Sequence, residues 1–211
     1  MGYYALWLES LDDLPVDPAH LAAARSAGDA LDVTRNPELV PFRLYVLGML
    51  ALRAKEPNAA RAWESRLAAL PAGRDSVTQD LTHMLRARLS LHAQDVAAAA
   101  SELEKLELRV PYSRVGFFAN LAPSRLRARV AADRGLFAEA LRLESVADFY
   151  DPFAPAAMTG GHERRGVLLR KLGQTEAASA SFGRAAVLLR DCEPSQVPRR
   201  DRLAALARDS N

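Results

Sequence analysis

Side chains that could do catalytic or metal chemistry are few in this sequence and widely spaced. Two of its four histidines, His83 and His92, are nine residues apart, which places them on opposite faces of a helix. The sequence has no HExxH or CxxC motif and no carboxylate cluster with metal-ligand spacing. The glycines of Thr159–Gly166 lack the Gly-Lys-Ser/Thr ending of a phosphate-binding loop, and no Gly-x-Ser-x-Gly motif is present. We therefore expect no metal, no cofactor and no catalytic residue, and we expect that the protein is not an enzyme.

Arginine is the residue type with the clearest potential for recognition. Of the 28 basic residues only three are lysines, so 25 are arginines. Arg125 and Arg129 are four residues apart and share a helix face, and Arg88 takes the place of Arg129 in an earlier helix. Arg170 and Lys171 follow one turn further along in a later helix. Since guanidinium groups pair bidentately with carboxylates and phosphates, these five residues are a candidate groove for a partner with acidic groups.

Two simpler explanations apply to the same arginines. They fit solvated charges with acids such as Asp133 and Glu163 nearby, and a GC-rich coding sequence would favour Arg and Ala everywhere. The 28 basic residues face 26 acidic ones, and the resulting net charge of +2 is too small to indicate a DNA-binding or membrane-binding surface. We therefore do not expect nucleic acid or a membrane as a partner.

The chain's apolar residues follow helical spacing almost throughout. Blocks rich in Ala, Leu, Arg and Glu, which are good helix formers, alternate with short breakers containing Pro, Gly or Asn. A hydrophobic fraction of 49% excludes a disordered chain. The predicted helices are 18–31, 39–54, 58–70, 77–92, 95–108, 121–134, 137–149, 162–172, 175–190 and 198–208.

These helices are expected to form pairs that repeat along the chain. Residues 121–134 and 137–149 have an apolar face each and are joined at Gly135, which predicts a helical hairpin that must stack on another hairpin. A central residue followed eight positions later by proline recurs, and that proline would end the second helix of each pair. The instances are Trp7…Pro15, Trp63…Pro71, Leu103…Pro111 and Glu144…Pro152, with Phe182…Arg190 as a variant.

The last hairpin resembles a tetratricopeptide repeat. Gly166, Gly173, Ala178, Phe182 and Ala185 have the spacing of that repeat, with small residues where helices approach, a glycine in the turn and an aromatic filler. Earlier copies match less well. They are Ala128, Gly135, Ala140, Glu144 and Pro152; then Ala87, Gln94, Ala99, Leu103 and Pro111; then Leu47 or Gly48, Ala54, Ala59, Trp63 and Pro71.

The repeat period departs from that family. The central residues from Trp63 onward are 40, 41 and 38 residues apart, whereas tetratricopeptide units repeat about every 34 residues. Longer helices or the loops Val110–Asn120 and Asp151–Gly161 would hold the excess. Armadillo-like and HEAT-like arrays, with periods of about 40–47, remain an alternative.

The predicted fold is therefore all-α, a right-handed α-solenoid of about four stacked hairpins with a capping helix at its C-terminal end. Residues 1–38 would form an N-terminal helical segment left from an incomplete repeat, 39–190 the repeats, and 191–211 the capping helix and tail. The C-terminal run also resembles the repeat regions of large bacterial Ser/Thr kinases and transcriptional activators, in Asp151–Phe153, Leu188–Pro194 and Arg199–Ala207. That resemblance implies a regulatory segment of a longer protein.

The function that these features predict is binding. In tetratricopeptide arrays the first helices line a concave groove, so the resemblance implies a scaffold that holds a protein or peptide segment there. A helical module that senses a small anion or a nucleotide is the alternative, and self-association through an uncapped end is a further expectation. The single cysteine, Cys192, and the absence of a signal segment or a long apolar run indicate a cytoplasmic protein.

Overall fold

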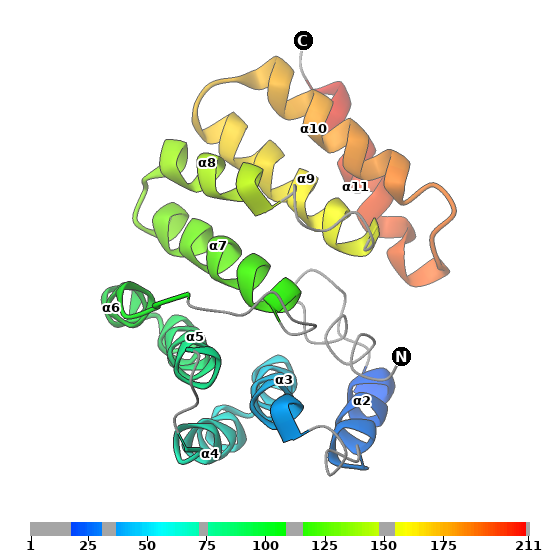
Figure 1. Cartoon of the computed structure of the whole chain (residues 1–211). Helices are drawn as coiled ribbons and strands as arrows, with labels where there is room; N and C mark the ends of the chain where they lie inside the picture. The colour runs from blue at the N-terminus through cyan, green and yellow to red at the C-terminus, as the bar shows by residue number, and fades with distance from the viewer. Residues whose placement is uncertain (1–17, 31–36, 72–75, 109–115, 148–154, 210–211) are drawn as a thin grey trace. The chain divides into compact units, whose positions relative to one another are not determined.

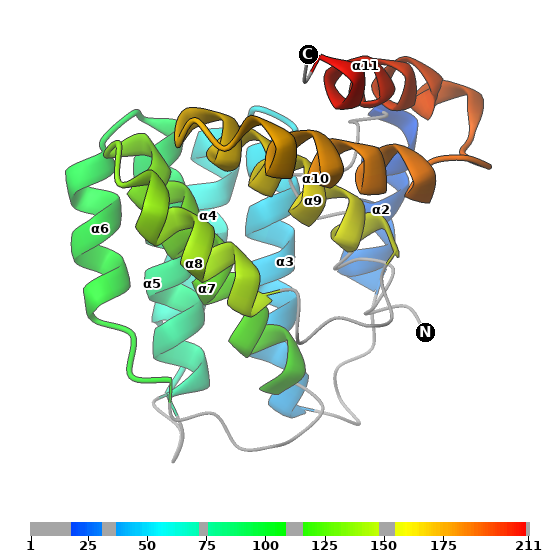
Figure 2. The same cartoon turned by 90° about the horizontal axis from the view of Figure 1, so that it is seen from above.

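The structure, a computed structural model of the chain, describes residues 18–30, 37–71, 76–108, 116–147 and 155–209. These residues form α-helices and short 3-10 helices, with no strand among them, which confirms the predicted all-α class (Figures 1 and 2). The helices are α2 (Pro18–Ala30), η1 (Pro37–Leu39), α3 (Val40–Arg53), α4 (Pro57–Ala68), α5 (Val77–His92), α6 (Val96–Glu104), α7 (Gly116–Asp133), α8 (Phe137–Ala147), α9 (Pro155–Lys171), α10 (Thr175–Leu188), η3 (Pro194–Gln196) and α11 (Val197–Arg208).

The chain divides into two compact units, residues 1–123 and 124–211. The first unit contains α2 to α6, and the second contains the C-terminal part of α7 and the helices α8 to α11. In the described part of the chain no helix has the length and apolar character needed to cross a bilayer. The predicted right-handed solenoid, which would span both units, stays a prediction.

Four helical pairs share one turn. The pairs are α3–α4, α5–α6, α7–α8 and α9–α10, and each turn holds one residue with a positive φ: Lys55, Gln94, Gly135 and Gly173. In each turn the next amide donates to the carbonyl five residues earlier, at 2.9 Å in all four. This hydrogen bond defines the Schellman motif, which ends the first helix and reverses the chain. The four turns are 39, 41 and 38 residues apart, so the same helix-ending turn recurs along the chain, while the predicted number and stacking of repeats stay predictions.

Small residues recur at the points where helices pack closely. Four alanines, each five residues after a turn residue, have no exposed surface: Ala60, Ala99, Ala140 and Ala178. On the first helices the matching small positions are also buried: Gly48, Ala87, Ala128 and Gly166. A Cβ on Gly166 would lie 2.5 Å from Cε1 of Phe182, so this position must remain a glycine for the helices to approach. These observations agree with the small residues singled out in the sequence for the second, third and fourth hairpins.

The register predicted for the first hairpin was wrong by one residue. We expected Ala54, Ala59 and Trp63 to take the turn, small and central places, but the turn residue is Lys55 and the fully buried alanine is Ala60. Trp63 is half-buried beside the central place, and Arg66 stacks on its ring at 4.7 Å. The one-residue error came from the Trp…Pro spacing that this hairpin shares with Trp7…Pro15, because no glycine marks its turn.

Part of each segment that was offered as a loop lies in a first helix. Helix α7 begins at Gly116 and α9 at Pro155, so residues 116–120 and 155–161 are helical. Gly160 and Gly161 are buried within α9. Pro15, Pro111 and Pro152, together with Trp7 and Asp151–Phe153, fall outside the described residues.

Each unit has its own hydrophobic core. In the first unit Leu50, Leu67 and Leu85 are fully buried between α3, α4 and α5. In the second unit, one cluster joins α7, α8 and α9, and another joins α10 to α11 around Phe182 and Leu203. Helix α11 matches the predicted amphipathic helix 198–208 and covers α10 with Leu203. Helix α2, expected at the N-terminal end, packs on α3.

Candidate functional site

The five basic residues predicted to line a groove are divided between the units. Arg88 lies on α5 in the first unit. In the second unit, Arg125 and Arg129 lie on α7, and Arg170 and Lys171 end α9. The structure therefore brings Arg125 and Arg129 onto one helix, as predicted, and Arg88 belongs to the other unit.

Most of these side chains have partners within the chain. Arg129 is half-exposed and reaches the Asp133 carboxylate of its own helix at 3.9 Å. Arg170 donates from Nη2 to the carbonyl oxygen of Leu206 at 3.2 Å, and its guanidinium lies 5.2 Å from the centre of the Phe182 ring. Arg170 thus stabilises the last turn of α11, where carbonyls lack helical partners. Arg88 and Arg125 are half-buried with interactions of their own, while Lys171 is exposed.

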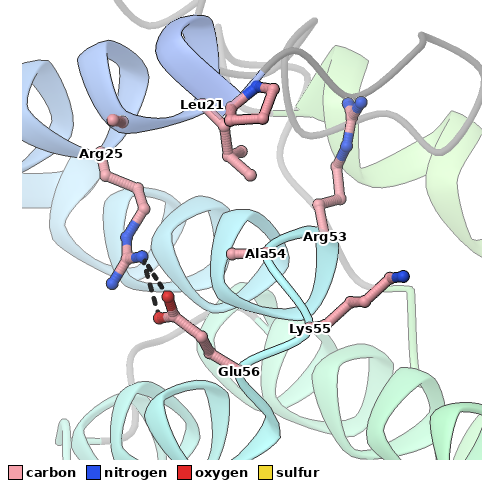
Figure 3. Close-up of a pocket in the computed structure, with 8 residues that line it drawn as sticks. Leu21, Arg25, Arg53, Ala54, Lys55 and Glu56 are labelled. Carbon is pink, nitrogen blue, oxygen red and sulfur yellow. Dashed lines mark hydrogen bonds and ion pairs between the residues drawn. The ribbon is translucent and has the colours of Figure 1, made fainter.

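A different basic site lies in the first unit and was not foreseen from the sequence. A hollow of about 470 Å³ opens between α2 and the turn that joins α3 to α4 (Figure 3). We call it the α2–α3 pocket. Its lining comes from two short segments, with four residues each: Pro18, Leu21, Ala22 and Arg25 from α2, and Arg53, Ala54, Lys55 and Glu56 from the turn.

Charge in this pocket is unbalanced. Arg25 and Glu56 form an ion pair, with Nη1 of the arginine 2.9 Å from Oε1 and 2.8 Å from Oε2 of the glutamate. Figure 3 shows Arg53 and Lys55 on the other side of Ala54 from this pair. The pocket therefore carries three cations against one carboxylate, around a floor of Leu21, Ala54 and other apolar side chains. Such a site attracts a negatively charged group that is attached to an apolar one.

Packing and hydrogen bonds at both ends of α2 hold this pocket open. Leu21 and Ala24 are buried, and α2 lies against α3. At the other end of α2, Arg43 of α3 donates from Nε to the Gly28 carbonyl and from Nη2 to the Asp29 carbonyl, both at 2.7 Å. These carbonyls belong to the last turn of α2, where no helical amide can reach them. The arginine fixes α2 on α3 and so sets the position of the pocket wall.

Other charged residues link neighbouring helices. In the first unit Arg86 of α5 reaches Glu64 of α4 at 2.7 Å. In the second unit Arg164 of α9 donates from Nε and Nη2 to the buried Glu144 of α8, at 2.8 and 3.1 Å. Glu144 stands where the repeat pattern has an aromatic residue, and the guanidinium compensates its buried charge.

A histidine and a lysine hold one carboxylate in the α5–α6 hairpin. Nδ1 of His83 lies 2.8 Å from Oε2 of Glu102, and Nζ of Lys105 lies 2.5 Å from Oε1. Burial acts to raise the pKa of Glu102, but hydrogen bonds and charges from His83 and Lys105 outweigh it and lower the pKa below 4.5. The described residues contain no group of three or more His, Cys, Asp or Glu arranged to hold a metal. The contact between His83 on α5 and Glu102 on α6 joins the two helices of this hairpin.

Comparison of the chain with protein-family models, with curated proteins and with solved structures found no match.

Proposed function

We propose that the protein is a non-catalytic binding module that takes an acidic segment of a protein partner in the α2–α3 pocket. The observation that carries this proposal is the excess of two positive charges around an apolar floor in that pocket. An acidic side chain next to an apolar one in the partner would satisfy both parts of the lining. The proposal moves the binding site from the predicted arginine groove, because Arg129 and Arg170 already serve contacts within the chain.

The hairpins support a binding role in a second way. Four helical pairs with the same turn and the same buried small residues resemble a tetratricopeptide array, a class used for protein recognition. Fold alone does not establish function, so this likeness supports the proposal without carrying it. A stacked right-handed array, a cytoplasmic location, self-association and a place in a longer signalling or transcription protein belong to the same proposal.

A labelled peptide of alternating Glu and Leu, with a Gln–Leu peptide as its uncharged counterpart, tests the proposal by fluorescence anisotropy. Ala22→Trp should fill the pocket, and Ala23→Trp is the matched control, because Ala23 is an exposed neighbour on α2 that does not line the pocket. We expect the acidic peptide to bind the wild type and Ala23→Trp alike, and to lose about tenfold in affinity on Ala22→Trp. Salt should weaken binding. Equal binding of the two peptides, or unchanged affinity on Ala22→Trp, would overturn the proposal.

A second candidate is the sensing of a small anion, and the size of the pocket favours it. A volume of about 470 Å³ lies in the range of small-molecule sites. Under this alternative, pyrophosphate or ATP should raise the unfolding temperature saturably in the wild type but not in Ala22→Trp. The acidic peptide would then bind weakly or not at all.

A further inference from the structure

We propose that Lys55 is the residue of the α2–α3 pocket that pairs with the partner's carboxylate, and that the chain keeps a lysine there at the expense of its own stability. This inference rests on the proposed function and names the side chain that gives the pocket its specificity for an acid. The ligand group is the side-chain carboxylate of an Asp or Glu in an extended or helical peptide.

The backbone of Lys55 is in an unfavourable conformation for a residue with a side chain. Its φ is 60°, in the left-handed region that costs an L-residue free energy because Cβ approaches the neighbouring carbonyl. The equivalent places in the second unit are Gly135 and Gly173, with φ of 76° and 73°. Glycine adopts this conformation without that cost, so it is the residue that the turn favours. A lysine at such a place therefore costs the fold free energy that a glycine would not.

The three cations of the pocket differ in their contacts within the chain. Arg25 is held by Glu56, and Arg53 has an interaction partner of its own within the chain. Lys55 is exposed and lines the pocket, and no ion pair joins it to any residue in the described ranges. Its ammonium is therefore the cation that an incoming carboxylate can reach without breaking an existing contact. A flexible stem lets the ammonium adjust to the position of that carboxylate.

The second hairpin of the same unit supplies a matched control. Gln94 has a φ of 61° in an identical turn, it is exposed like Lys55, and it does not line the pocket. Replacing either residue by glycine relieves the same backbone strain, but only the substitution of Lys55 removes a charge from the pocket. Lys55→Gln removes the charge and leaves the backbone strain in place.

The experiment combines thermal unfolding with the anisotropy assay on the Glu–Leu peptide. We expect Lys55→Gly and Gln94→Gly to raise the unfolding temperature by about 3 °C each, since both relieve a left-handed L-residue. Lys55→Gly and Lys55→Gln should lower the affinity for the peptide by about fivefold. The affinity of both variants should also depend less on salt. Gln94→Gly should bind as the wild type does, and Lys55→Gln should gain no stability.

The outcomes separate this inference from the proposed function. If Ala22→Trp abolishes peptide binding but Lys55→Gly and Lys55→Gln bind the peptide as tightly as the wild type, the pocket is the binding site. The claim that Lys55 pairs with the carboxylate is then wrong. If Lys55→Gly weakens binding but gains no stability while Gln94→Gly does, the claim that lysine is kept at a cost to stability is wrong. If Ala22→Trp leaves affinity unchanged, the proposed function itself fails.

Discussion

Asp80 shows how one buried side chain can fix two distant parts of a unit. Asp80 is only 2% exposed, and its carboxylate accepts hydrogen bonds from the Ser76 hydroxyl and from the backbone amides of Glu107 and Leu108, the amides at 2.9 and 3.1 Å. The start of α5 is thereby joined to the chain that leaves α6.

Asp80→Asn should destabilise the first unit by about 2 kcal/mol, because an amide nitrogen cannot accept the hydrogen bond that a carboxylate oxygen does. Denaturant unfolding measures the loss. Asp95→Asn is the control, since the exposed Asp95 caps α6 through Ala98 at 2.9 Å and asparagine caps a helix equally well. Equal losses in the two variants would contradict this account of Asp80.

Glu102 makes stability depend on pH in a defined direction. Its pKa in the folded protein is lowered below 4.5 by His83 and Lys105 despite burial, so folding favours its ionised form. The stabilisation is present above pH 4.5 and is lost as the pH falls through the lowered pKa.

We expect Glu102→Gln to flatten the decline of the unfolding free energy below pH 4.5, measured by urea unfolding at a series of pH values. Glu104→Gln, at an exposed position of the same helix, should leave the slope as in the wild type. A slope that is unchanged in Glu102→Gln would show that the ion pairs do not contribute.

At the scale of the helical pair, how closely two helices can pack at a small residue depends on which atoms of the neighbouring helix face it. A Cβ at Gly166 would lie 2.5 Å from the Phe182 ring, whereas at Gly183 the nearest atom is the Ala207 Cβ at 3.8 Å. Gly166→Ala should therefore lose about 2 kcal/mol by overpacking a rigid ring. Gly183→Ala should gain about 0.5 kcal/mol or more from helix propensity. Thermal or urea unfolding compares them, and a loss in both variants would rule out the ring contact as the cause.

The sequence predicts the hairpins well where glycine marks the turn. Gly135 and Gly173 identified their turns, but Lys55 and Gln94 adopt the same conformation without being glycines. The pattern depends on glycine and aromatic residues, so it placed the first hairpin one residue too early, with Trp63 at the central position.

The pocket could not be predicted from local patterns. It joins residues 18–25 to residues 53–56, and only the packing of α2 on α3 brings them together. The partners of Arg170 could not be predicted for a related reason, since its contacts lie in α10 and α11.

At the scale of the whole molecule, each unit carries its own core, so damage to one core should not reach a site in the other. Leu203 has no exposed surface and anchors α11 on α10 in the second unit. Leu203→Ala should cost about 3 kcal/mol there. We expect the Glu–Leu peptide to bind this variant as it binds the wild type at temperatures where the second unit stays folded. Weaker binding under those conditions would show that the pocket depends on the second unit.

The shared turn has a consequence for hydrogen exchange. Amides in loops usually exchange quickly with solvent, but in these turns the amides of Glu56, Asp95, Leu136 and Gln174 are bonded to the helix before them. Each of these bonds must break before its amide can exchange. The deuterium uptake of four single amides therefore reports how readily each of the four turns opens, which compares the local stability of the turns along the chain.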